Sequence, residues 1–482
     1  MILFIYIIFA SLASILGYFY AGDGMNSWFM SLCSMAMGGA SILFCKTMHL
    51  RFQNWGYLSA SSLFCLGFWI VHFFYAVLLI FYEEVEFFSI YLWPHPDRAN
   101  YTTLVSVLAF SGFYLGYLSL ALRAPHLKVR SVTVLSIQSL SRLSLAAPLI
   151  SILNFACFIS VVGPTYLSGG YAGSGNWGSG ATYFFQFFEL FFYLSLILEV
   201  YKIKLKNKQI GVFAYALSFN WLTIVFLFAF IVFNLYIGDR GPILTSVFIV
   251  VGGYDFFIKR FRLVAVVLAL TLGIAAMSYV STYRTRDAGA SLEERVEEAK
   301  YKLEEKQWYH APGELGSNVR TANVGIAMAH SEGFWYGKFQ AVHLMGVIPF
   351  AKGVVIYALN IPFGLTSGGY LTMVINGGRG VGVGTTPVAD VYLDFGLLGI
   401  IIMFPCLGRF IAWLELNAFS TSSVYHFVVY MWVLAEALYW PRAAFLHNLN
   451  EWLWAIFILW VVHKTLLRSR SVSESVLWRP MF

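Results

Sequence analysis

The chain has 482 residues, of which 59% are hydrophobic and only 11% are charged, and its formal net charge is +7. Soluble domains contain about 25% charged residues, so this composition excludes an ordinary soluble protein. Hydrophobic runs continue from one end of the sequence to the other. They predict a single all-α, polytopic membrane domain over residues 1–482.

The hydrophobic runs that are long enough to span a bilayer predict about twelve transmembrane helices. They cover residues 1–20, 28–45, 57–81, 102–122, 144–162, 181–200, 212–236, 242–257, 263–281, 387–408, 423–441 and 450–467. The first run lacks a basic start and a small-residue cleavage site, so we expect a retained helix rather than a cleaved signal. All five cysteines lie within hydrophobic segments without CxxC spacing, and neither a disulfide nor structural zinc is expected.

Lys and Arg residues gather in every second connection, in segments 46–51, 123–142, 202–208 and 259–262, and again in the C-terminal tail. Cytoplasmic loops carry such an excess of basic residues. Both termini are therefore predicted to be cytoplasmic. This topology also explains the positive net charge, so we expect no nucleic-acid partner.

Residues 282–386 are predicted to form a large extracytoplasmic loop between the ninth and tenth spans. Its first part contains the capping box Ser291–Glu294, followed by hydrophobic residues at helical spacing, which predicts an amphipathic helix. That helix could cover a site or serve as a solvated brace. The segment His343–Leu359 contains Pro349 and Lys352, and we expect it to be re-entrant or interfacial, because a full crossing would invert the basic tail.

Arginines on the extracytoplasmic side are candidates for binding a lipid-linked diphosphate, because a planar guanidinium matches phosphate oxygens. Arg240 lies in the short outer turn Gly238–Pro242, where it could bind phosphate or simply pair with Asp239. The further candidates are Arg284, Arg320, Arg379 and Arg442.

Candidates for acid–base catalysis must be carboxylates or imidazoles on the same side. They are His330, Glu332 and Asp394, and each could equally be a hydrogen-bonded structural group. Glu189 lies inside a run of phenylalanines, where a carboxylate is costly and usually faces a cavity or a partner. It could serve a transporter as a proton relay, or line an enzyme cleft.

No metal site or cofactor is expected. Residues 380–384 look like a phosphate loop but lack the Gly-Lys-Ser/Thr ending and a preceding strand. Glu83, Glu84 and Glu86 form the one acidic cluster that could hold a divalent cation. The first outer loop offers only Asp23. The Gly-rich segment 169–183 could present aromatic rings to sugars or be a linker.

In its C-terminal half the sequence resembles the Wzy-type O-antigen or oligosaccharide-repeat-unit polymerases, with a fainter similarity to O-antigen ligases. The resemblance rests on the turn Gly238–Arg240, on Gly333–Gly337 before Ile348-Pro349, on Thr386-Pro387 through Asp394–Gly399, and on Arg442. Ligases usually carry His-Asn where this chain has Thr386-Pro387, which favours a polymerase.

This resemblance implies a GT-C-like, metal-independent glycosyltransferase of the bacterial inner membrane, with its active site facing the periplasm. The enzyme would transfer a growing glycan from undecaprenyl diphosphate to the next lipid-linked repeat of an O-antigen, capsule or exopolysaccharide. Its partners would be these lipid-linked oligosaccharides, the bilayer and a chain-length regulator protein. The arginines would hold diphosphate, and His330, Glu332 or Asp394 would activate the acceptor. A ligase-like transferase or a flippase is the alternative.

Overall fold

The structure, a computed structural model, describes most of the chain. The residues outside the description are 1, 52–55, 83–85, 88–89, 124–136, 164–179, 207–209, 238, 283–292, 295–296, 298–299, 301–308, 350, 362–365, 378–381, 421–422 and 467–482. Arg284, Arg379, Ser291 and Glu83 therefore lie outside the described residues, and so do most of the predicted amphipathic helix and the segment 169–179.

The described residues form an α-helical bundle with one two-residue hairpin, β1 Glu86–Phe87 and β2 Ile90–Tyr91. The helices before residue 283 are α1 Ile2–Ala21, α2 Ser27–Arg51, α3 Ala60–Leu78, η1 Pro96–Arg98, α4 Ala99–Ala121, α5 Ile137–Val162, α6 Ala181–Leu205, α7 Val212–Ala216, α8 Trp221–Ile237, α9 Gly241–Val247, η5 Phe248–Gly252, α10 Gly253–Phe257 and α11 Leu263–Thr282. After them come α13 His310–Gly316, α14 Val319–Glu332, α15 Lys338–Met345, α16 Ala351–Ala358, α17 Ser367–Asn376, α18 Pro387–Ser420, α19 Val424–Glu436, η7 Trp440–Arg442 and α20 Leu449–Leu466.

In the described part of the chain, seven helices are long and hydrophobic enough to cross a membrane, and further apolar helices are shorter. The chain is therefore a multi-pass membrane protein, as predicted. Every predicted run coincides with helical structure, although the bounds of many helices differ from those of the runs. Segment 212–236 divides into α7 and α8, and the run that begins at residue 387 continues as α18 to Ser420. The total of twelve spans stays a prediction.

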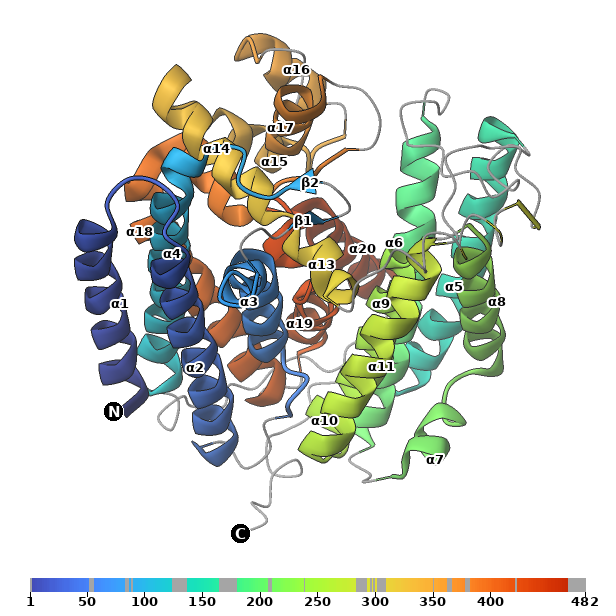
Figure 1. Cartoon of the computed structure of the whole chain (residues 1–482). Helices are drawn as coiled ribbons and strands as arrows, with labels where there is room; N and C mark the ends of the chain where they lie inside the picture. Colours follow the sequence, from blue (N-terminus) through green and yellow to red (C-terminus); the bar gives the residue numbers. More distant parts are fainter. Residues whose placement is uncertain are drawn as a thin grey trace.

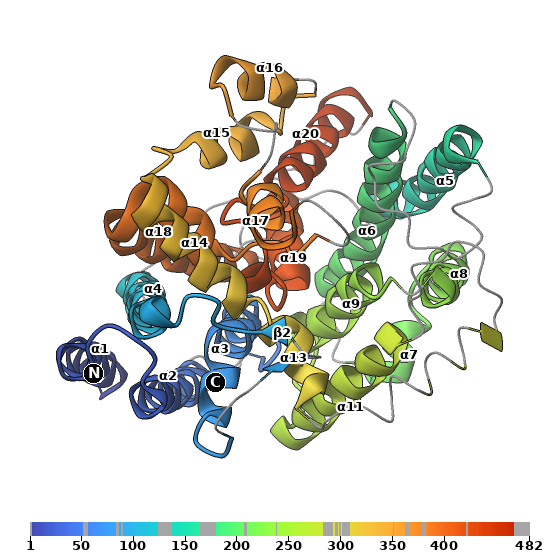
Figure 2. The same ribbon diagram turned by 45° about the horizontal axis from the view of Figure 1, so that its top comes forward.

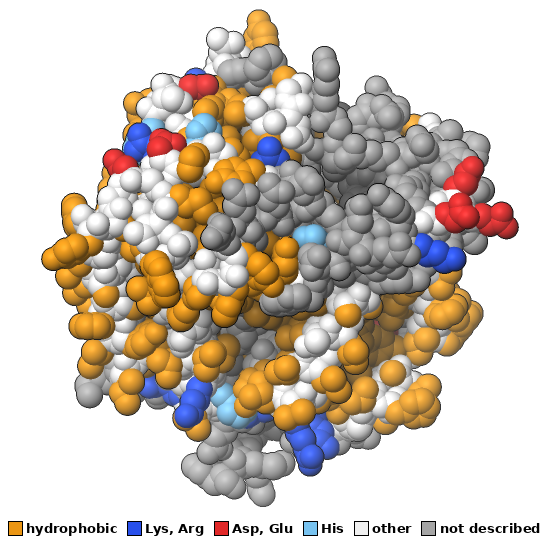
Figure 3. Space-filling view, viewed as in Figure 1, with side chains coloured by type: hydrophobic (Ala, Val, Ile, Leu, Met, Phe, Trp, Pro, Cys, Tyr) orange, Lys and Arg blue, Asp and Glu red, His pale blue; other side chains and the backbone are white. Residues whose placement is uncertain are grey.

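Helix α1 begins at the lower end of the bundle in Figure 1. The helices of the late loop, α14 to α17, lie at the opposite end. Seen from that end, α1 to α4 and α18 form one side of the bundle, α5, α6 and α8 form the other, and α19 lies between them (Figure 2). In Figure 3 a group of Lys and Arg side chains lies at the lower edge, and hydrophobic side chains cover the middle.

Helices α4 and α18 pack with their backbones in contact, because glycines leave room for it. Gly112 and Gly116 form a GxxxG pair on α4, a pattern that allows membrane helices to approach closely. A β-carbon on Gly116 would collide with the carbonyl oxygen of Pro405, and one on Gly408 would collide with the carbonyl oxygen of Phe113. This contact holds α4 against the middle of α18.

Helix α18 is kinked at Gly396, which has φ 60° and ψ −151°. The kink removes the helical donors that would otherwise reach the carbonyl groups of Leu393 and Asp394. These carbonyls instead accept the backbone N–H groups of Trp335 and Tyr336, each at 2.9 Å. The loop that follows α14 is thereby fixed to α18.

The segment expected to be re-entrant, 343–359, contains the end of α15 and all of α16, and each of these two helices has eight residues. At 1.5 Å per residue each is about 12 Å long, whereas the hydrocarbon core of a bilayer is about 30 Å thick. Neither helix can cross the membrane by itself.

Candidate functional site

Arg240 and Arg442 come from distant parts of the sequence and lie near the same side chain, Tyr439, whose carbonyl accepts the N–H of Arg442 at 2.8 Å. Arg240 is the residue before α9, and Arg442 ends η7. The positive charges of both act on the phenol of Tyr439, together with the negative charges of Asp239 and Glu436. Nearby charges have such effects only at short range in a protein. Helix α9, which follows Arg240, lies beside α19 in Figure 2.

A histidine and a carboxylate lie beside this pair of arginines. The Nε2 atom of His447 is 3.4 Å from Oε2 of Glu436, and the Glu436 side chain is only 11% exposed. Both groups lie close enough to interact electrostatically with the carboxyl of Glu451. This carboxyl accepts a hydrogen bond from the Trp432 indole at 3.0 Å. We call Arg240, Arg442, Tyr439, Glu436 and His447 the inner centre.

The turn between η7 and α20 is held rigidly, which fixes the position of His447. The Trp440 indole donates to the carbonyl of Phe445 at 3.0 Å, and the Phe445 N–H donates to Oδ2 of Asp390 at 2.8 Å. The same carboxylate oxygen accepts the side-chain amide of Gln340 at 2.6 Å. Asp390, fully buried, thus connects α15, α18 and the inner centre.

Several buried polar atoms around the inner centre have no hydrogen-bond partner among the described residues. They are Oδ1 of Asp390, Oε1 of Gln340, Nε2 of His343 and Nε of Arg320. Burial lowers the pKa of His343, with Asp390 acting against this and His447 adding to it, so His343 lies near both. Because buried polar atoms are normally satisfied, these atoms are available to a substrate or to water.

Arg320, another predicted phosphate ligand, lies in the first turn of α14, close to the inner centre. A β-carbon placed on Gly384 would be 3.7 Å from Oδ1 of Asn318 and 3.8 Å from the carbonyl oxygen of Arg442. The start of α14 therefore lies near η7. Burial lowers the pKa of Arg320, since charge is costly away from water.

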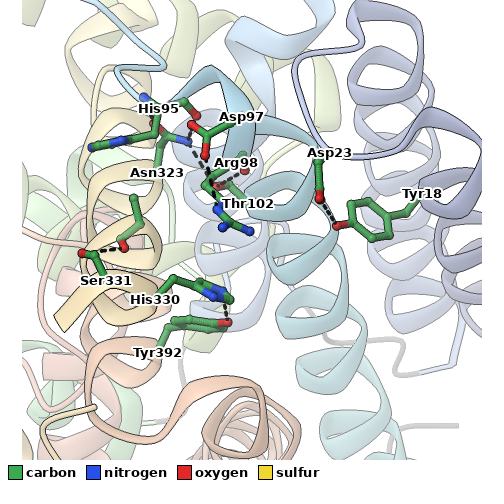
Figure 4. A network of polar contacts seen from close by, with 11 residues as sticks. Tyr18, Asp23, His95, Asp97, Arg98, Thr102, Asn323, His330, Ser331 and Tyr392 are labelled. Atoms are coloured by element: carbon green, nitrogen blue, oxygen red, sulfur yellow. Dashed lines mark hydrogen bonds and ion pairs between the residues drawn. The ribbon is translucent and has the colours of Figure 1, made fainter. Parts of the chain in front are cut away.

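His330 belongs to a second polar group, at the outer ends of α1, α4 and α14 (Figure 4). Its Nε2 atom is 3.0 Å from the hydroxyl of Tyr392, which is 2.9 Å from the hydroxyl of Tyr101. Burial lowers the pKa of His330, the charge of Arg98 lowers it further, and Asp23 raises it. We call this group the outer cluster. Its members are Tyr18, Asp23, Arg98, Tyr101, His330 and Tyr392.

The two predicted catalytic carboxylates differ in their surroundings. Glu332 is exposed at the end of α14 and accepts a hydrogen bond from the Tyr370 hydroxyl at 2.7 Å. Asp394 is fully buried and accepts the backbone N–H groups of Phe339 at 3.3 Å and Gln340 at 2.9 Å. Asp394 thus satisfies two backbone donors at the N-terminus of α15, as a capping side chain does.

The structure separates the inner centre from the outer cluster. Asp390 and Tyr392 are two residues apart on α18, so at 3.6 residues per turn they point about 200° apart, to opposite faces. Asn318 begins α14 near Arg442, and His330 follows twelve positions later in the same helix. That interval corresponds to about 18 Å along the helix axis.

Sequence reasoning missed His447, Glu436, Tyr439 and Asp390 as site residues. One available signal was Glu436, which lies in the hydrophobic run 423–441, because an ionisable residue inside a span usually has a function. The same argument selected Glu189, whose Oε1 atom is 3.5 Å from the hydroxyl of Tyr193. Glu436 also acts electrostatically on Glu189.

No three His, Cys, Asp or Glu side chains among the described residues are grouped so that they could hold a metal ion. The acidic cluster weighed for this purpose lies partly outside those residues.

Fold and site together define a multi-pass membrane protein with an arginine, carboxylate and histidine centre below the helices of a large late loop. The family model of the O-antigen polysaccharide polymerase Wzy matches residues 2–470, nearly the whole chain. The chain belongs to this family, as the sequence resemblance predicted. No curated protein and no solved structure matches the chain.

Proposed function

We propose that the protein polymerises undecaprenyl-diphosphate-linked oligosaccharide repeats into an O-antigen or a related surface polysaccharide. Family membership supports the polymerase role. The observation that carries the assignment of the site is that Arg240 and Arg442, far apart in the sequence, both lie near Tyr439. Two guanidinium groups suit the two phosphates of the carrier and offset the charge that develops as it leaves.

In the transfer step, the bond between the anomeric carbon of the growing glycan and the diphosphate oxygen breaks. A new bond forms between that carbon and a hydroxyl oxygen of the acceptor repeat. His447 accepts the proton of this hydroxyl, and Glu436 orients the imidazole and stabilises its positive charge. The diphosphate leaves with its electron pair, held by the arginines, so the step needs no metal ion in this proposal.

The assignment of the base to His447 rests on distance. A base must lie within hydrogen-bond reach of the hydroxyl that it deprotonates. His330 and Glu332 lie at the far end of α14, about 18 Å along the helix from the neighbourhood of Arg442, and Asp394 is occupied by the N-terminus of α15. Catalysis by these three stays a prediction, and the inner centre offers the better geometry.

The remaining phosphate ligands belong to the same proposal. Arg320 is placed to meet a second lipid-linked diphosphate, because its buried Nε has no hydrogen-bond partner among the described residues. Arg284 and Arg379 stay candidates from the sequence. We further propose a GT-C-like enzyme in the bacterial inner membrane, with cytoplasmic termini, a large periplasmic loop over residues 282–386, an active site that faces the periplasm, and a chain-length regulator as partner.

The test uses the purified protein in nanodiscs with lipid-linked repeats, and follows glycan length without nucleotide sugar or added metal. The wild type is expected to build chains. Arg240→Ala and Arg442→Ala should abolish growth, and Arg409→Ala, on an exposed position of α18, is the matched control. Full activity of Arg240→Lys would exclude bidentate phosphate recognition by this residue. Transport of unchanged repeats across the membrane would instead indicate a flippase.

The base is tested by His447→Gln, with His463→Gln, in the helix α20 that follows this turn, as the control. General-base catalysis contributes about 10²- to 10⁴-fold to a rate. We expect His447→Gln to lower kcat by about this factor while KM changes little. A rise in KM alone would assign His447 to substrate binding.

A further inference from the structure

The outer cluster is a second, preformed polar surface that the transfer step does not use. Asp23 and His330 are exposed, and Tyr18, Arg98 and Tyr101 are half-buried around them. In Figure 4 the side chains of Arg98 and His330 extend toward the same space, and Tyr18 and Asp23 lie on the other side of it. This surface is therefore accessible to a ligand rather than part of the packed core.

Hydrogen bonds fix the loop that carries Asp23 onto the segment that carries Arg98. The N–H of Gly24 donates to the carbonyl of Asp97 at 3.2 Å, and the side-chain amide of Asn100 donates to the carbonyl of Gly22 at 3.0 Å. Gly22 and Gly24 have φ of 68° and 125°, values that favour glycine on both sides of Asp23. The position of Asp23 is therefore built into the backbone.

Helix α14 is attached to the same segment. The side chain of Asn323 accepts the N–H of His95 at 2.9 Å and donates to its carbonyl at 3.0 Å. This pair of bonds holds η1, and with it Arg98, on the helix that carries His330. Polar groups from α1, α4, α14 and α18 are thereby ordered before any ligand arrives, which reduces the entropy cost of binding.

The chemistry of this surface suits a neutral sugar better than a phosphate. Asp23 and Arg98 carry opposite charges, and the lowered pKa of His330 leaves its imidazole neutral at pH 7. The ring of Tyr101 is 5.9 Å from that of Tyr18 and 5.5 Å from the His330 imidazole. Aromatic rings accept the apolar face of a pyranose, while carboxylate, guanidinium and phenol groups bond its hydroxyls.

We propose that the outer cluster binds sugar residues of the glycan at a distance from the transfer centre. The proposal rests on the proposed function, because the separation from the inner centre matches a short oligosaccharide whose diphosphate end lies at Arg240 and Arg442. The outer cluster then holds the chain on the opposite face of α18 while the reducing end reacts.

The experiment measures the affinity of the full-length protein in nanodiscs for short, lipid-free oligosaccharides cut from the surface polysaccharide of the source strain. Tyr18→Ala and the double variant Asp23→Asn/Arg98→Gln should each bind at least about tenfold more weakly, because hydrogen bonds to charged groups contribute about 1.5–3 kcal/mol. Tyr20→Ala, two residues away with a 96% exposed ring, is the matched control and should bind as the wild type does.

Unchanged affinity in both outer-cluster variants would overturn the proposal, as would equal weakening by Tyr20→Ala. A wild type that binds phospholipid headgroups but not the oligosaccharide would also overturn it and would assign the surface to the bilayer. Because this measurement needs no lipid-linked substrate, failure of the polymerisation assay would affect the proposed function alone.

Discussion

His330 lies between charges of opposite sign, which makes its titration a direct report on the outer cluster. Burial and Arg98 lower its pKa from the usual 6.5, and Asp23 acts the other way. We expect the histidine to titrate below 6.5 by NMR of imidazole-labelled protein. Arg98→Gln should raise this pKa and Asp23→Asn should lower it, because each removes one of the two opposing charges. Shifts of the reverse sign would show that these side chains do not face the imidazole.

At the residue scale, the sequence points to Arg240 and Arg442 as candidates but not to His447, to which we assign the role of base. An arginine at the mouth of a hydrophobic run is visible in the sequence because its charge is costly there. His447 carries no such signal, since it follows the span in a polar turn and gains its role only where the turn brings it to Glu436. For Asp394 the sequence motif suggests a catalytic carboxylate. It does not reveal that the carboxylate accepts the backbone N–H groups of Phe339 and Gln340.

The contact between α4 and α18 is an element-scale feature that a single methyl group should disturb. Gly116→Ala places a β-carbon against the carbonyl of Pro405, so the two helices must move apart. Overpacking of this kind costs about 1–3 kcal/mol. A thermal unfolding series in detergent should show a lower unfolding temperature than for Gly273→Ala, whose β-carbon meets nothing within 4 Å. Equal stability of the two variants would contradict this backbone contact.

The attachment of α15 depends on Asp394. In Asp394→Ala the N–H groups of Phe339 and Gln340 lose their acceptor, which for a helix cap costs about 0.5–2 kcal/mol. Hydrogen exchange followed by mass spectrometry should show faster exchange in residues 338–345 and unchanged exchange in α20. If α15 exchanges as in the wild type, Asp394 does not hold it, and its predicted catalytic role gains weight.

Hydrophobic runs located the membrane helices, because burial in lipid requires an uninterrupted apolar segment whatever its neighbours are. The hydrophobic runs did not predict the kink at Gly396 or the short helices α15 and α16. These features depend on contacts between distant segments, such as the bonds from Trp335 and Tyr336 to α18. A pattern along one stretch of sequence does not contain that information.

On the scale of the whole molecule, α18 separates the two sites, with α4 packed against it as a support. An enzyme that lengthens a polymer needs one place for the reacting end and another for the rest of the chain. In our proposals, opposite faces of α18 near Asp390 and Tyr392 serve these two purposes. On this view, loosening the α4–α18 contact should disturb the distance between the sites as well as the stability of the fold.

The orientation of the whole bundle can be tested by labelling single cysteines with a membrane-impermeant maleimide. Tyr357 on α16 is 89% exposed and lies with the late loop, whereas Leu50 near the end of α2 is 70% exposed and lies toward the basic side. Tyr357→Cys should react in intact spheroplasts, and Leu50→Cys only after lysis. The unsubstituted protein is the blank, since its five cysteines all lie within α2, α3, α5 and α18. The reverse pattern would place the late loop, and with it the inner centre and the outer cluster, on the cytoplasmic side.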